Sequence, residues 1–201
     1  MQKDIRQSNG VCFRINPSDH TSSIIKSDQA RGDIFIPAYI IYEDEKYKIT
    51  TIESDAFQYT KIDSLKFAED SEITTFGNLI FNSSSVKKIQ IPGKVKYLDE
   101  LWCGAVTDLI DIEISPNNPN FSYIENKYFV GKSQEKSDTF DVLLYARFDI
   151  KEAVIRPSML LPSNPSGRSF TFAMNSAFQA VNEDALRKKE KENAKLAQRQ
   201  S

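Results

Sequence analysis

His20 is the only histidine in this chain of 201 residues, so it limits the metal and acid–base chemistry that the sequence could support. A zinc site needs three or four His, Cys or carboxylate ligands, and no other His or Cys stands at a ligand-type spacing from His20. A Ser-His-Asp triad would also need His20, but the sequence has no recognisable acidic motif or Gly-x-Ser-x-Gly elbow to complete it. We therefore expect His20 to lie in a turn or on the surface.

Two other motifs could suggest a ligand, and neither is complete. Gly131-Lys132-Ser133 resembles the end of a phosphate-binding Walker A loop, but Asn126 stands where that motif requires its first glycine. Three aspartates lie close together without the spacing of a calcium-binding EF-hand loop: Asp138, Asp141 and Asp149. The sequence therefore predicts no cofactor and no metal, and it argues against an enzyme.

Cys12 and Cys103 are the only cysteines, which is too few for a disulfide framework. We expect both to be free, buried thiols, although one Cys12–Cys103 bridge stays open if the protein is exported.

Charge and composition limit the classes of partner that the sequence favours. The net charge is −2 and the isoelectric point is about 5.6, so no basic surplus favours nucleic acid. The basic stretch at 187–191 contains Glu190, and its apolar face is too thin for membrane insertion. No signal peptide and no membrane-spanning run is visible, which predicts a cytoplasmic protein. The 21 Ile against 11 Leu favour β-structure.

An internal repeat positions most of these isoleucines. Segments 62–67, 86–92 and 109–114 each show an apolar residue, two intervening positions and two apolar residues separated by a polar one. Leu65, Ile89 and Ile112 are spaced by 24 and 23 residues. Because alternate strand residues face opposite sides, each segment predicts a short strand with one inward column. The predicted inward residues are Leu65, Phe67, Ile89, Ile91, Ile112 and Ile114.

A second pattern recurs between these segments at nearly the same period. Segments 49–52, 73–76 and 95–98 are followed by the pairs Ala56-Phe57, Ile80-Phe81 and Trp102-Cys103. Such units are too small to bury their apolar ridges alone, so we predict a stack of coils with a continuous core, plugged at one edge by these pairs. An antiparallel β-sandwich is the rival interpretation, but it explains the alternation and not the fixed period.

The outward positions of the predicted strands form the candidate partner-binding surface. The first column holds Ser64, Lys88 and Asp111, and the second holds Phe35, Lys66, Gln90 and Glu113. Solenoids present such columns as an extended surface for ligands. The alternatives are that these are ordinary solvated strand faces, or that loops at the edges bind instead.

The repeat pattern Ile-x-x-Leu-x-Ile-Pro, Val-x-x-Ile and Ala-Phe resembles BspA-like leucine-rich repeats. A second block strengthens the resemblance, since an Asn-Pro-aromatic turn in 115–124 leads into 128–133 and 141–146, as in the family's longer unit with a short strand pair. The opening segment 10–16 resembles the family's N-terminal cap. The resemblance covers about residues 10–157, and it implies a leucine-rich-repeat solenoid that binds proteins at the cell surface.

Together these observations predict a β-rich leucine-rich-repeat solenoid with an N-terminal cap and a C-terminal α-helix. We expect a hairpin at 42–47, and the absence of further repeats suggests a short or truncated family member. The predicted divisions are a flexible N-terminus (1–9), the cap (10–32), the solenoid (33–157), a Pro/Ser linker (158–174) and a charged helical tail (175–201).

The expected function is a non-enzymatic protein-binding module. The family resemblance implies adhesion through the solenoid surface. The alternative is an intracellular scaffold that uses the solenoid together with the C-terminal helix, and the missing signal peptide favours it.

Overall fold

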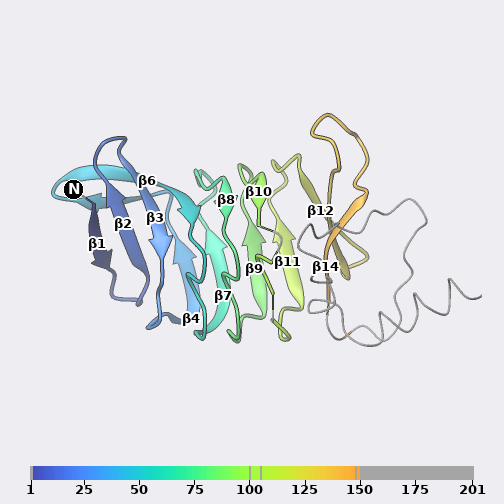
Figure 1. Cartoon of the computed structure of the whole chain (residues 1–201), viewed down its shortest axis with the longest axis horizontal. Helices are drawn as coiled ribbons and strands as arrows, with labels where there is room; N and C mark the ends of the chain where they lie inside the picture. The colour runs from blue at the N-terminus through green and yellow to red at the C-terminus, as the bar shows by residue number, and fades with distance from the viewer. Residues whose placement is uncertain (1, 100, 105, 148, 150–201) are drawn as a thin grey trace, which may run out of the picture.

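The structure is a computed structural model, and it describes residues 2–99, 101–104, 106–147 and 149. In that part of the chain all regular secondary structure is β-strand, in three sheets (Figure 1). The seven-stranded sheet contains β1 (Lys3–Arg6), β2 (Cys12–Asn16), β3 (Thr21–Ile25), β5 (Tyr39–Tyr42), β6 (Glu45–Ile52), β8 (Thr75–Phe76) and β10 (Tyr97–Leu98). The four-stranded sheet contains β4 (Arg31–Ile36), β7 (Lys61–Phe67), β9 (Lys88–Ile91) and β11 (Asp111–Ile114). The three-stranded sheet contains β12 (Phe121–Ile124), β13 (Tyr128–Gly131) and β14 (Val142–Ala146).

The first two sheets are the two walls of a solenoid. From β6 to β11 the chain alternates between them, so each turn contributes one strand to the seven-stranded sheet and one to the four-stranded sheet. Figure 1 shows β4, β7, β9 and β11 side by side in that order along the long axis. All of these neighbours pair in parallel, which excludes the antiparallel sandwich.

The strand register confirms the repeat period. Leu65 pairs with Ile89, and Ile89 pairs with Ile112, so residues 24 and 23 positions apart are neighbours in adjacent turns. Five of the six predicted inward residues are buried, and Ile114, near the end of the stack, is partly buried against the core.

The apolar pairs plug the coil as the sequence predicts. The rings of Phe57 and Phe81 stack at 5.9 Å between centroids and 8° between planes, and Trp102 meets Phe81 edge-on at 6.4 Å. The backbone of this coil forms its own ladder, since the Phe57 N–H donates to the Ile80 carbonyl at 2.8 Å and the Ile80 N–H donates to the Trp102 carbonyl at 3.0 Å. Each turn is therefore bound to the next by main-chain hydrogen bonds and by side-chain packing.

Left-handed residues shape this coil at the same place in two successive turns. Asp55 and Leu79 have φ of 59° and 50° just before the apolar pair, and Tyr59 and Ser83 have φ of 59° and 56° two residues after it. A non-glycine residue in this region is strained, so the stacked neighbours must hold the backbone in place.

The segment before the predicted cap contains a strand that the sequence did not predict. β1 pairs antiparallel with β2 over Lys3–Arg6. The strand is held because Ile5 packs on the core and Arg14 pairs with Asp4 at 3.1 Å. The predicted hairpin is confirmed: β5 and β6 are joined at Glu43 and Asp44, whose positive φ values of 50° and 63° suit a two-residue hairpin turn.

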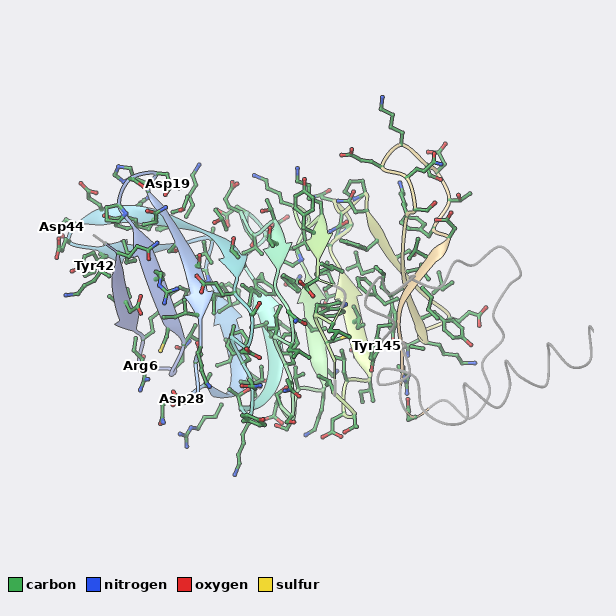
Figure 2. The ribbon with its side chains drawn as sticks, in the orientation of Figure 1. Arg6, Asp19, Asp28, Tyr42, Asp44 and Tyr145 are labelled. Atoms are coloured by element: carbon green, nitrogen blue, oxygen red, sulfur yellow. The ribbon has the colours of Figure 1, made fainter. Side chains whose placement is uncertain are left out.

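The longer unit leaves the solenoid through the Asn-Pro turn. Asn118 is buried, and its Nδ2 donates to the carbonyls of Pro92 and Val95 at 2.7 and 3.0 Å. The strand pair implied by the family resemblance is present as β12 and β13, and β14 extends it. Tyr145, labelled in Figure 2, ties this sheet to the solenoid because its hydroxyl donates to the Leu109 carbonyl at 2.6 Å. The predicted solenoid end, linker and C-terminal helix, from 150 onward, lie outside the described residues.

Candidate functional site

The first predicted column exists as a row of register partners across the four-stranded sheet. Ser64 pairs with Lys88, and Lys88 pairs with Asp111. The Lys88 ammonium lies 3.5 Å from the Asp111 carboxylate. The structure extends this column by one residue, because Asp33 of β4 pairs with Ser64.

Ser64 is the least accessible residue of the first column. It is only 7% exposed, and its hydroxyl donates to the Asp33 carboxylate. A serine is shorter than the lysines around it, so a column position alone does not make it accessible. Ser64 therefore orients Asp33 and presents little surface of its own.

The second column runs beside the first with different chemistry at each turn. Phe35 pairs with Lys66, and Gln90 pairs with Glu113. Phe35 is 58% exposed, which is unusual for a phenylalanine and leaves its ring open to solvent. Gln90 stabilises the sheet, because its Oε1 accepts a hydrogen bond from the Phe67 N–H at 2.9 Å. Lys66 and Glu113 make no ion pair with any residue that the structure describes.

Two adjoining hollows follow these columns. The larger, of about 500 Å³, lies over β4, β7 and the start of β9, and the smaller, of about 80 Å³, lies over β7, β9 and β11. Lys66 and Lys88 line both of them. All seven predicted residues line one hollow or the other, so the structure brings the whole predicted set together on one face.

Three further residues line the larger hollow and were missed in the sequence: Asp33, Asp63 and Lys87. The Lys87 ammonium lies 3.1 Å from the Asp63 carboxylate. These two residues are 24 positions apart, which is the repeat period, so the same comparison of turns could have found them. Asp63 was hidden by a register shift after Gly32 that places it outside the regular alternation.

His20 and the two cysteines, which the sequence offered as candidates for metal or acid–base chemistry, make structural contacts. His20 lies in the turn between β2 and β3, stacked on Tyr47 at 5.7 Å and within 3.5 Å of the Glu45 carboxylate. Cys12 and Cys103 are free and buried, and burial raises the pKa of the Cys103 thiol, which keeps it unreactive. Among the described residues no group of three His, Cys, Asp or Glu side chains could hold a metal ion.

Gly131-Lys132-Ser133 marks the end of β13 and the start of the loop to β14. The Ser133 N–H and hydroxyl both donate to the Asp141 carboxylate, at 2.8 and 2.6 Å, and these bonds lower the pKa of Asp141. Asp141 therefore closes the hairpin loop, as expected for a turn of the longer unit.

The comparison with known families decides the relationship. A family model described as a BspA-type leucine-rich repeat region matches residues 41–141 in six copies, which is half of the chain. The chain belongs to the BspA-type leucine-rich repeat family. The leucine-rich repeats of such proteins typically make interaction modules and not enzymes, which agrees with the expectation drawn from the sequence.

Solved structures similar to this BspA-type chain are remote. A leucine-rich repeat protein from Bacteroides capillosus has 19% identity, covers 56% of this chain and 98% of its own, and gives a TM-score of 0.39. A leucine-rich repeat protein from Eubacterium ventriosum has 16% identity, covers 73% of this chain and 51% of its own, and gives a TM-score of 0.35. A leucine rich cell surface protein from Faecalibacterium prausnitzii has 12% identity, covers 72% of this chain and 62% of its own, and gives a TM-score of 0.30.

The chain thus spans almost all of the first structure and half to three fifths of the other two. None of the curated proteins compared with the chain matches it. In the part of this BspA-type chain that the structure describes, no helix has the length and apolar character needed to cross a bilayer.

Proposed function

We propose that the chain is a protein-binding module and that the outer face of the four-stranded sheet receives the partner. One observation carries this proposal: all seven candidate residues line two adjoining hollows on that face. The face offers an open aromatic ring at Phe35 and a lysine without an ion-pair partner at Lys66, side by side on β4 and β7. Aromatic side chains are enriched in interface cores, and charged side chains belong to the polar rim around them.

The charges on this face that have no ion-pair partner among the described residues differ in sign along the solenoid. Lys66 lies on β7, while Glu113 lies on the last strand of the sheet. A partner that binds here would present an apolar group and a carboxylate to the early turns and a cation to the last turn. Electrostatic complementarity of this kind sets orientation and association rate more than affinity.

The test is a pull-down with matched charge reversals. Lys66→Glu with Lys88→Glu changes the proposed face, and Lys3→Glu with Lys26→Glu makes the same charge change on exposed lysines of β1 and the end of β3. We expect the variant of the face to lose the partners that the wild type and the control retain. If the face variant is folded and binds the same partners with unchanged affinity, the four-stranded sheet is not the binding face.

Adhesion and intracellular scaffolding remain two forms of the same proposal. The family resemblance favours adhesion at the cell surface. Tagging the native protein separates the two, because surface staining of intact cells that disappears after mild proteolysis supports adhesion. Staining confined to permeabilised cells would instead support the scaffold.

A further inference from the structure

A second cleft, of about 350 Å³, lies away from the four-stranded sheet, between β10 and the three-stranded sheet. One wall is the β10 segment, with Lys96, Tyr97 and Leu98. The facing wall is a row of register partners across the three-stranded sheet: Phe121, Gly131 and Val142. The cleft forms because the longer unit diverts the chain into the three-stranded sheet, and in the part of the chain that the structure describes no strand follows β10 in its sheet.

The floor of the cleft is apolar around Gly131. Gly131 is buried and has Leu144 and Phe121 around it. A Cβ at this position would lie 2.9 Å from Leu144 Cδ1 and 3.5 Å from the Phe121 ring. A glycine inside a strand often marks the close approach of another chain or a ligand. Here it allows the side chains of Leu144 and Phe121 to close over the backbone of Gly131, and together they form the apolar floor of the cleft.

The β10 wall exposes an unpaired strand edge. The Tyr97 N–H donates to the Thr74 carbonyl and the Asp99 N–H donates to the Phe76 carbonyl, both toward β8. Amide groups alternate in direction along a strand, so the amide and carbonyl of Leu98 point to the opposite edge, at the cleft. Among the described residues β10 is the last strand of the seven-stranded sheet, so no described strand covers this edge and it can pair with an added strand.

The rim is positively charged. Lys96 and Lys132 both line the cleft, against one carboxylate from Glu135. Neither lysine has an ion pair with a described residue; the Lys96 ammonium lies 5.2 Å from the Tyr97 ring centroid and the Lys132 ammonium lies 5.1 Å from that of Phe140. Tyr97 is 59% exposed beside them. An acidic side chain at the rim would find two cations that the fold itself does not neutralise.

We propose that this cleft binds an extended acidic peptide segment of a partner protein, which pairs as a strand with the edge of β10 at Leu98. Its apolar side chains face the apolar floor at Phe121 and Leu144, and its alternating acidic side chains face Lys96 and Lys132. A peptide fits better than a small molecule because main-chain hydrogen bonds are what the Leu98 edge offers. The site is separate from the face of the four-stranded sheet and stands without it.

The probe is a blocked, fluorescein-labelled hexapeptide of alternating glutamate and valine, measured by fluorescence anisotropy with the full chain. We expect saturable binding that weakens roughly tenfold when Lys96→Glu and Lys132→Glu are combined, and that weakens as salt is added. Lys3→Glu with Lys26→Glu is the matched control, because both lysines are exposed and line neither the cleft nor the hollows of the four-stranded sheet, and it should leave the affinity unchanged. A peptide of alternating lysine and valine should bind at least tenfold more weakly.

Main-chain pairing needs its own measurement, since charge alone could attract the peptide. Amide hydrogen exchange at Leu98 should slow when the glutamate–valine peptide saturates the chain, and exchange in β9 should not. Lys96→Ala with Lys132→Ala is a second variant in case the reversal disturbs folding. Absence of saturable binding at millimolar peptide overturns the proposal. So does equal binding by the cleft variants, or unchanged exchange at Leu98. Each of these results leaves the proposal for the four-stranded sheet intact.

Discussion

Replacing Leu65 by alanine is the most direct test of the inward register. Leu65 is fully buried in β7, with Ile34 of β4 and Ile89 of β9 as its register partners. Strands on both sides are held by parallel pairing, so they cannot move inward to fill the space of the missing carbons. Leu→Ala substitutions in such sites typically cost about 2–5 kcal/mol, through lost burial and the remaining cavity. We expect Leu65→Ala to lower the free energy of unfolding within that range.

The measurement is a urea titration followed by tryptophan fluorescence. Trp102 is the only tryptophan of the chain, and it is buried with its ring 6.0 Å from that of Phe76. Its emission therefore reports on the inside of the solenoid. The matched control is Lys66→Ala, the next residue along β7, whose side chain is exposed and should contribute less than about 0.5 kcal/mol. If Leu65→Ala costs less than about 1 kcal/mol, or no more than the control, the register is refuted.

Three further predictions use the same titration. Tyr59 is 67% exposed and has a φ of 59°, a backbone region that asparagine tolerates and valine does not. The free energy of unfolding of Tyr59→Val should therefore be about 1–2 kcal/mol lower than that of Tyr59→Asn. Equal stability of the two variants would contradict the left-handed conformation. The Lys94 ammonium, 2.7 Å from the Glu72 carboxylate, lowers the Glu72 pKa, so its stabilisation is present above the unfolded-state pKa and lost as pH falls through the folded-state pKa. Glu72→Gln should therefore flatten the acid limb of the stability–pH curve, and an unchanged limb would show that the pair contributes nothing. Asn118→Ala should cost about 1–3 kcal/mol, because it removes two hydrogen bonds to the carbonyls of Pro92 and Val95, which then keep only the Val95 N–H and the Asn120 side chain as donors among the described residues. A loss below about 0.5 kcal/mol would mean that the two Asn118 bonds contribute little to stability.

The repeat made much of the fold predictable from the sequence. Spacing of 24 and 23 residues between Leu65, Ile89 and Ile112 predicted which residues would be neighbours in different turns, and the register confirms it. The prediction succeeded because each turn repeats one local structure, so alternation within a strand and period between strands suffice to place a residue. The strand β1 was not predicted for the same reason: it belongs to no repeat, and its pairing with β2 depends on contacts that no periodicity shows.

The candidate surface was predictable in position and not in accessibility. Alternation placed Phe35 and Lys66 on the outer face, where the structure has them exposed. It could not show that Ser64 is covered, since its burial depends on the hydroxyl's bond to Asp33 from the preceding turn. Asp63 was missed because one register shift moves it out of the alternation. Such shifts depend on how two particular strands fit together.

The sequence by itself determined the solenoid, its period, its inward columns and the family to which it belongs, because all of these follow from a pattern that recurs within the chain. Only the tertiary structure decided where the stacking of turns ends and which strand edge is then left unpaired. Asn118 diverts the chain by bonding the carbonyls of Pro92 and Val95, and β10 is left as the edge of its sheet beside Gly131. That cleft is made by segments from two differently folded units, and so no single stretch of sequence contains it.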